Sequence, residues 1–216
     1  PVAGPTGYDF LNLVTALFVD RDAEPKLDAI YRRVSGIDDS LAEIVYQQKR
    51  RVMADLFSGD VRALVVWLDR LTAWDRYGRD LGQREVGQAL TELIARFPVY
   101  RTYTTPAGVR DVDRVIVEQA IDAAIQHRPE LRRPLRFIRR VLLLEPAGYL
   151  EAGQEDERIP FVMRLQQFTG PVMAKGYEDT ALYIYNRLIA LNDVGGEPPP
   201  PSMPRWPTAP SAGRRR

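Results

Sequence analysis

The stretch DDSLAEIVYQQKRRVMADLF, residues 38–57, decides the class of fold. Its apolar side chains recur every three or four residues, which is the spacing that places them on one face of an α-helix. Asp38, Asp39 or Ser40 precedes the pattern, and each residue type can cap a first turn by accepting a hydrogen bond from a backbone N–H. The pattern predicts an amphipathic helix with an apolar face formed by Leu41, Ile44, Val45, Val52 and Leu56.

The same period recurs further along the chain and predicts six more helices. They are expected at residues 59–77, 85–97, 111–127, 134–144, 158–168 and 177–191. Pro160 is tolerated near the start of its helix, and Gly195 and Gly196 are expected to end the last one. Only FPVYRTYT, residues 97–104, breaks the period, and the residues after Pro98 alternate as in a short extended segment. Seven helices with almost no strand predict a mostly α fold.

The composition fits a globular protein and excludes several kinds of active site. Of 216 residues, 45% are apolar, which is enough to bury a core. Cysteine is absent, which excludes a disulfide framework and a thiolate nucleophile and fits a reducing cytoplasm. His127 is the single histidine, which argues against a histidine metal site or a Ser-His-Asp triad, and it is expected to be a solvated helix residue. The sequence shows no signal peptide and no run long enough to span a bilayer, so a cytoplasmic protein without a membrane partner is expected.

The charge of the chain is unevenly distributed. Residues 197–216 carry four arginines and one glutamate, a net charge of +3, and seven of the prolines. Since the whole chain has a net charge of +1, residues 1–196 have a net charge of −2. The tail is expected to be disordered with polyproline II character. The body is not basic, which weighs against a nucleic-acid partner.

An arginine-rich stretch, LRRPLRFIRR at residues 131–140, allows two interpretations. It could form a patch that binds phosphate or nucleic acid. Alternatively, it forms the solvated face of a helix whose leucines and Ile138 are buried on the other side. The net charge of the body favours the solvated face.

Three stretches together resemble one family. They are GPTGYDFLNLVTALFVD at residues 4–20, FPVYRTY at residues 97–103, and FVMRLQQFTGPVMAKGYEDTALYIYNRLIALNDVGGEP at residues 161–198. In content, order and spacing they are similar to the maltooligosyl trehalose synthases, which are relatives of the α-amylases. The resemblance covers residues 1–198 and is loosest in the helical middle.

The resemblance implies a reaction and an architecture. Members of this family convert the reducing-end α-1,4 bond of a maltooligosaccharide into an α,α-1,1 bond, by an intramolecular transfer that needs no cofactor. Their parent fold is a (β/α)8 barrel with large insertions. By this resemblance the chain is a helical insertion domain of such an enzyme, with short barrel-derived anchors at both ends. Residues 1–20 form the first anchor, 21–160 the insertion, 161–196 the return helices, and 197–216 the tail.

The resemblance also implies that the chemistry depends on other polypeptide. The family's nucleophile aspartate and acid–base glutamate precede the GYDF motif, and a third aspartate follows the VGG motif. The chain is therefore expected to contain no catalytic residue, to be inactive alone, and to have the rest of the barrel as its partner. Glu178 and Asp179 are adjacent, so on an α-helix they would point about 100° apart, which is poor geometry for flanking one bond.

The resemblance further implies a set of substrate-binding residues near the reducing-end subsites. Lys175, one of only three lysines, belongs with its neighbours to the family's KGxED motif, two tyrosines follow it, and the GYDF motif lies on the barrel side. The candidate residues are Tyr8, Asp9, Lys175, Glu178, Asp179, Tyr183 and Tyr185. For the two later tyrosines, packing against the barrel stays open as an alternative. For the two acids, the alternative is favourable charge in the first turn of a helix.

Two residues of the FPVYRTY stretch allow two interpretations. Arg101 and Tyr103 could face the cleft, but a structural role in the insertion is favoured.

The alternative to the family assignment is a free-standing helical module that binds a protein or a nucleic acid through its arginine-rich helix. Such a module would have no reason to carry sugar-pocket residues near both ends.

Overall fold

The computed structural model describes residues 7–150, 152–193 and 196, and the expected disordered tail at residues 197–216 lies outside them. Within these residues the chain is helical, with no strand beyond one isolated bridge between Thr105 and Gly108, so the mostly α fold is confirmed. The chain divides into two compact units. The first comprises residues 7–37 together with 186–193 and 196, and the second comprises residues 38–185.

The first unit contains two helices that the sequence analysis did not identify. They are α1 (Tyr8–Leu17) and α2 (Glu24–Ser35), accompanied by short 3-10 turns at Arg21–Ala23 and Ile189–Leu191. Arg187 joins the two ends of this unit, because its guanidinium bonds the carboxylates of Glu24 at 2.9 Å and Asp28 at 2.7 Å. The Arg187 side chain is 7% exposed, so this ion-pair network is largely shielded from solvent.

The second unit contains the remaining helices. They are α3 (Leu41–Asp55), α4 (Ser58–Trp74), α5 (Gln83–Arg96), α6 (Asp111–His127), α7 (Arg132–Leu142), α8 (Ala152–Asp156), α9 (Arg158–Met173), a π-helix η3 (Ala174–Ala181), α10 (Leu182–Ile184) and a 3-10 turn η2 (Pro129–Leu131). The six helices predicted between residues 38 and 168 are confirmed. Ser40 is the cap of α3, since its hydroxyl accepts from the Glu43 N–H at 3.2 Å. In the described part of the chain, no helix is both long and apolar enough to cross a membrane.

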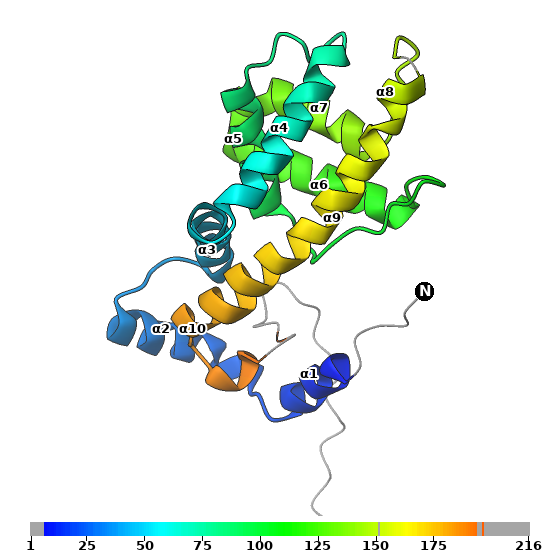
Figure 1. The fold of residues 1–216 in the computed structure, drawn as a ribbon. Coiled ribbons are helices and arrows are strands. Elements are labelled where there is room, and N and C mark those ends of the chain that lie inside the picture. The colour runs from blue at the N-terminus through cyan, green and yellow to red at the C-terminus, as the bar shows by residue number, and fades with distance from the viewer. Residues whose placement is uncertain (1–6, 151, 194–195, 197–216) are drawn as a thin grey trace, which may run out of the picture. The chain divides into compact units, whose positions relative to one another are not determined.

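Helix α5 is the centre of the second unit. It packs against α3, α4, α6 and α7, while α9 crosses α3, α4 and α7 (Figure 1). Its apolar residues are almost entirely inaccessible, among them Val86, Ala89, Leu90, Leu93 and Ile94. Because neighbours cover α5 on several sides, even its acidic residue Glu92 is only 1% exposed.

The buried carboxylate of Glu92 is satisfied by side chains from two other helices. The Tyr46 hydroxyl donates to it at 2.8 Å, and His127 Nδ1 lies 2.9 Å from its other oxygen. His127 is partly exposed at the end of α6, as expected, but its ring also packs edge-on against Tyr46 at 4.9 Å. The histidine therefore belongs to a network that satisfies a buried charge rather than to a purely solvated surface.

The segment at residues 97–104 is irregular, and a side chain takes the place of a partner strand. The Gln166 amide accepts from the Thr104 N–H at 2.6 Å and donates to the Thr104 carbonyl at 3.1 Å. Both residues are buried, so these bonds satisfy backbone groups that water cannot reach. The sequence pattern predicted an extended segment but could not show that its partner is a glutamine on α9.

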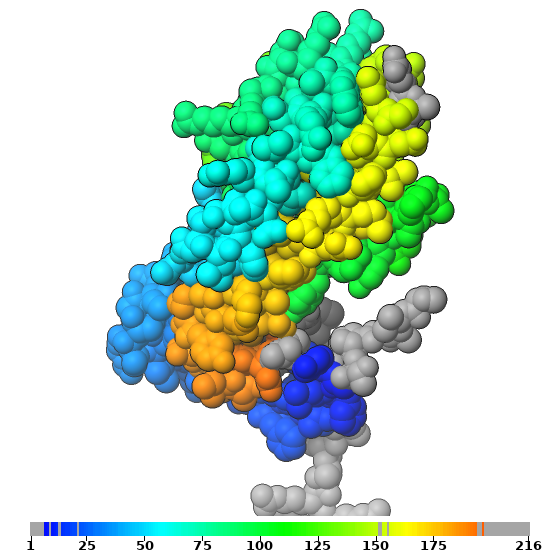
Figure 2. Space-filling model, in the orientation of Figure 1, coloured from blue at the N-terminus to red at the C-terminus, as the bar shows by residue number. Residues whose placement is uncertain are grey.

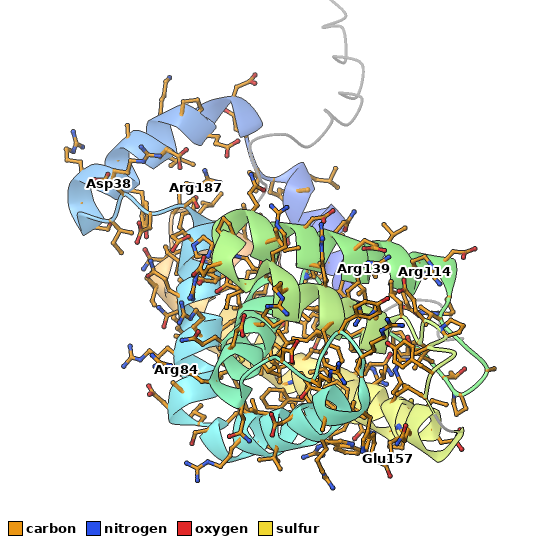
Figure 3. The ribbon with its side chains drawn as sticks, turned by 90° about the horizontal axis from the view of Figure 1, so that it is seen from above. Asp38, Arg84, Arg114, Arg139, Glu157 and Arg187 are labelled. Atoms are coloured by element: carbon orange, nitrogen blue, oxygen red, sulfur yellow. The ribbon has the colours of Figure 1, made fainter. Side chains whose placement is uncertain are left out.

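The arginine-rich helix α7 has the two-faced structure that the sequence favoured. Leu135 and Ile138 are fully buried. On its polar side, Arg139, labelled in Figure 3, pairs with Glu118 at 2.5 Å and Glu145 at 2.6 Å. Arg140 pairs with the buried Asp75 at 2.9 Å. Two of its five arginines are therefore neutralised by acids of this unit.

The single α-helix predicted for residues 177–191 is wrong. Helix α9 instead continues directly into the π-helix at Ala174, and regular helix ends at Ile184. Tyr185 leaves the helical region with φ −88° and ψ 88°. Pro171 lies inside α9 and has no N–H to donate, so the hydrogen-bond ladder is already interrupted just before the π-helix.

The π-helix packs against α3 through a glycine. A Cβ placed on Gly176 would lie 2.6 Å from Cγ of Lys49 and 2.8 Å from its Cα. Only glycine allows the two backbones to approach this closely. Lys49 is itself 2% exposed, and its ammonium donates to the carbonyl of Phe97 at 2.8 Å. One buried lysine therefore joins α3, the end of α5 and the π-helix.

We expect Gly176→Ala to destabilise the second unit by about 2 kcal/mol, because the added methyl overlaps backbone atoms of α3 that cannot move independently. Urea unfolding followed by circular dichroism measures the change. Gly59→Ala is the matched control, since a Cβ there meets nothing within 4 Å. An equal stability for the two variants would contradict the proposed close contact.

We expect the free energy of unfolding to rise with pH above about pH 8 because of the buried Lys49. Burial lowers the pKa of Lys49 from 10.5 to about 8 in the folded protein, so between these values the unfolded chain binds more protons. The free energy of unfolding should therefore rise between pH 8 and pH 10.5 by about 3 kcal/mol more in the native protein than in Lys49→Met. Denaturant titrations at several pH values check this, with the exposed Lys26→Met as control. Parallel curves for native protein and Lys49→Met would show that the lysine is not desolvated.

Candidate functional site

Three of the predicted site residues share the π-helix. Lys175, Glu178 and Asp179 all lie within η3, at the surface of the second unit, and Figure 2 shows this region exposed in orange tones. A π-helix is rare and is frequently found at functional sites. Thr180 supports its wider turn, because its hydroxyl donates to the Lys175 carbonyl five residues earlier at 2.7 Å.

The two acids of the motif have different partners. Lys175 donates to Asp179 at 2.5 Å, and both side chains are about half exposed, at 52% and 51%. The hydrogen bond to Asp179 raises the pKa of Lys175, so the lysine is a cation beside a carboxylate. Glu178 instead accepts a hydrogen bond from the Tyr100 hydroxyl. The π-helix therefore presents a fixed cation and two carboxylates at the surface.

Tyr100 is a further candidate residue, which sequence reasoning did not single out. It lies in the segment at residues 97–104, which Lys49 holds at the Phe97 carbonyl and Gln166 holds at Thr104. The tyrosine is 41% exposed, and its hydroxyl reaches Glu178 across 78 positions of sequence. The sequence offered one signal, because Tyr100 belongs to FPVYRTY, one of the three stretches that resemble the family. Within that stretch only Arg101 and Tyr103 were considered as residues that could face the cleft.

Lys49 is the second residue that was missed. The sequence offered one signal, because a lysine stands in a chain where 27 of 30 basic residues are arginine. It touches Gly176 on the motif side and bonds the Phe97 carbonyl on the Tyr100 side. Its contacts therefore fix the relative placement of the two segments that carry the site.

The later tyrosines are placed differently from each other. Tyr183 lies in α10 and is 79% exposed, so it is available to a ligand. Tyr185 is only partly exposed and follows the end of α10, where its N–H donates to the Ala181 carbonyl at 2.8 Å. Within the second unit, Tyr183 is therefore the more accessible of the two.

The GYDF residues lie in the first unit. Tyr8 begins α1 and is 43% exposed. Asp9 follows it in the same helix, and its side chain lies outside the described residues. The left-handed conformation of Gly7, with φ 89°, precedes the helix and suits the glycine of the motif.

Arg101 and Tyr103 contact each other, which fits the favoured structural role. The Arg101 guanidinium lies 4.8 Å from the centre of the Tyr103 ring, and that of Arg110 lies 5.1 Å from it. Such cation–π contacts stabilise the surface of the segment. Arg110 is in turn bonded to the buried Asp113 at 2.6 Å.

The arrangement can bind polar groups but does not form a metal centre. Among the residues that the structure describes, no cluster of three or more histidine, aspartate and glutamate side chains could hold a metal ion. The site is an open surface, while two cavities elsewhere measure about 10 Å³ each, which is room for one water. Carboxylates, an ammonium group and phenol hydroxyls in fixed positions are suited to a neutral ligand rich in hydroxyl groups.

Comparisons with known proteins agree on one family. No protein-family model matches the chain. A Mycobacterium tuberculosis H37Rv protein named as a maltooligosyl trehalose synthase is 30% identical over 200 residues, which are 92% of this chain and 22% of the relative. The maltooligosyltrehalose synthase structure from Arthrobacter ramosus matches with a TM-score of 0.73 and 31% identity, over 92% of this chain and 22% of that one. A Sulfolobus tokodaii maltooligosyl trehalose synthase structure matches with a TM-score of 0.57 and 28% identity. This match covers 91% of this chain and 21% of that one.

The matches therefore cover nearly all of this chain but about a fifth of each relative. They agree with the observed helical architecture, which corresponds to a helical segment of much longer proteins. The chain belongs to the maltooligosyl trehalose synthase family and spans about 22% of the length of the relatives that it matches.

Proposed function

We propose that this chain forms reducing-end subsites of a maltooligosyl trehalose synthase. The observation that carries the proposal is the paired arrangement on the π-helix, where Lys175 is bonded to Asp179 and Glu178 to Tyr100. Each polar group already has one partner that fixes its position, and each is exposed enough to contact a ligand. A glucose unit offers hydroxyl groups that can both donate to the carboxylates and accept from the ammonium.

The proposed reaction needs a site that retains a released sugar. In retaining chemistry, a carboxylate takes the glycosyl unit while an acid gives a proton to O4 of the terminal glucose. That glucose then turns, its O1 attacks the glycosyl carbon, and the O1 proton returns to the same acid–base group. Both catalytic carboxylates would come from other polypeptide of the full protein. Residues of this chain would hold the glucose between the two steps.

The chain's second proposed task is to exclude water. Water that reaches the glycosyl-enzyme intermediate would release free glucose and end the transfer. Tyr183, exposed beside the π-helix, offers a ring that can cover a sugar face and a hydroxyl that can bond it. Tyr185 is the partly buried neighbour of this group. Tyr8 and Asp9 in the first unit would contribute from the barrel side.

The proposal assigns a role to each part of the chain. Residues 1–20 anchor it to the barrel, residues 21–160 form the helical insertion, and residues 161–196 return to the barrel with the KGxED motif. The remaining barrel is the proposed partner, and a maltooligosaccharide is the proposed substrate. The free-standing module gains no support, because Arg139 and Arg140 of its supposed binding helix are paired with acids of the same unit.

The central test is Lys175→Ala in a full-length chimera in which residues 7–193 replace the matching segment of the Arthrobacter ramosus synthase. Loss of the ammonium removes a charged hydrogen-bond donor and loosens Asp179, so the terminal glucose should escape more often. We expect the ratio of hydrolysis to transfer to rise about tenfold. Chromatography of glucose and trehalose-ended products measures this ratio.

The control for this test is Lys26→Ala, which removes an exposed lysine of α2 outside the candidate site. It should leave the product ratio unchanged. An unchanged ratio in Lys175→Ala would sink the assignment of the lysine to the acceptor site.

A second prediction concerns Tyr100→Phe in the same chimera. The change keeps the ring but removes the donor to Glu178, so the carboxylate loses a fixed position. We expect the KM for maltopentaose to rise about fivefold. Tyr103→Phe is the matched control, because its ring contacts two arginines and should retain them. Equal KM values for both variants would contradict a role for Tyr100.

A further inference from the structure

The exposed aromatic side chains of the described second unit fall into two groups. Tyr100, Tyr103 and Tyr183 belong to the segments around the π-helix. A second group, which we call the distal aromatic cluster, consists of Trp74, Tyr77 and Tyr149, which are 39%, 61% and 43% exposed. The proposed function uses Tyr100 and Tyr183 of the first group, so the distal aromatic cluster has no role assigned to it.

The distal aromatic cluster lies at the far end of the second unit from the π-helix. Trp74 ends α4, and Tyr149 lies in the turn that leads to α8 and α9. Figure 1 shows the loop after α4 and the start of α8 at one end, with α10 at the other. Since α9 connects the two ends through 16 residues, about 24 Å separate them.

A buried carboxylate holds the two tyrosines of the cluster. The Asp75 side chain is 5% exposed and accepts from the Tyr149 hydroxyl at 2.8 Å and from Arg140 at 2.9 Å. It also accepts from the N–H of Tyr77 at 2.8 Å. Asp75 thus makes bonds to both exposed tyrosine residues, and Arg140 balances its charge.

The two tyrosine rings of the cluster are held in place by contacts within the protein. The Tyr77 and Tyr149 rings lie 6.2 Å apart at 74°, and the Arg140 guanidinium lies 5.0 Å from the centre of the Tyr77 ring. The turn is also packed tightly, since a Cβ on Gly78 would lie 3.0 Å from the ring of Phe137. Rings that are already fixed lose little conformational freedom when they bind, which favours affinity.

We propose that the distal aromatic cluster is a second binding surface for α-1,4-glucan. Aromatic rings stack on the apolar faces of sugars, and the phenol groups of Tyr77 and Tyr149 can bond sugar hydroxyls. Asp75 and Arg140 neutralise each other, and residues 76–80 add two arginines and one aspartate, a net charge of +1, so the rings rather than the charges would select the ligand. The identity of the sugar rests on the proposed function, while the surface itself rests on the cluster.

Such a surface would bind a long glucan away from the reducing end. Binding at one point raises the effective concentration of the chain near a second point on the same protein. The separation of about 24 Å means that the distal aromatic cluster would contact sugar units well removed from those at the π-helix. It would therefore favour long substrates over short ones.

The test is affinity electrophoresis of the full 216-residue chain in native gels that contain amylopectin, with dextran gels for comparison. We expect amylopectin to retard the native chain and dextran to have no effect. Tyr77→Ala should raise the apparent Kd for amylopectin about fivefold, because one stacking ring is lost. Tyr103→Ala removes a tyrosine that is 54% exposed and lies outside the cluster, against Arg101 and Arg110, and it should leave the Kd unchanged.

Three results would overturn the inference. They are no retardation of the native chain, equal retardation by dextran, or retardation that survives both Tyr77→Ala and Trp74→Ala. Thermal melts by circular dichroism confirm that each variant is folded, and the 61% exposure of Tyr77 makes its replacement the least disruptive. The product ratio of Lys175→Ala tests the acceptor site separately, so either proposal can fail while the other stands.

Discussion

The candidate site depends on one buried hydrogen bond, which the ammonium of Lys49 donates to the carbonyl of Phe97. Burial of a cation costs free energy, and that cost is visible as a pKa lowered to about 8. The lysine donates a hydrogen bond to the Phe97 carbonyl at the C-terminal end of α5, and its side chain packs against Gly176. The π-helix and the Tyr100 segment both rest on this residue. The polar surface of the site is therefore built on a polar group in the core.

This arrangement explains which parts of the fold the sequence could predict. Helices α3, α4, α6 and α7 bury apolar residues against the central helix α5, and α9 buries its own against α3, α4 and α7, which stabilises each of them as a helix. Ser40 could be named as a possible cap because a hydroxyl at that position satisfies a specific N–H. These are local rules. They hold here because no long-range contact competes with them.

The site itself depends on contacts that local rules do not contain. The π-helix arises where Pro171 interrupts the ladder, Gly176 meets α3, and the Thr180 hydroxyl bonds a carbonyl five residues back. Periodicity alone predicted one α-helix there and placed its end seven residues too late. Likewise, Tyr100 joins the site only because Gln166 and Lys49 hold its segment from other helices. The family motifs predicted a set of candidate residues, and the tertiary contacts show which of their atoms meet in the folded chain.

The ion pairs of Arg187 with Glu24 and Asp28 have a consequence for how the protein is organised. They connect residues that are about 160 positions apart in sequence. Residues 38–185, which form the second unit, are therefore inserted between two chain segments of the first unit. Changes of length in loops of residues 38–185 that are remote from the π-helix would leave these ion pairs within the first unit unchanged. Such loops can therefore change in length during evolution while Arg187 keeps the two chain segments of the first unit together.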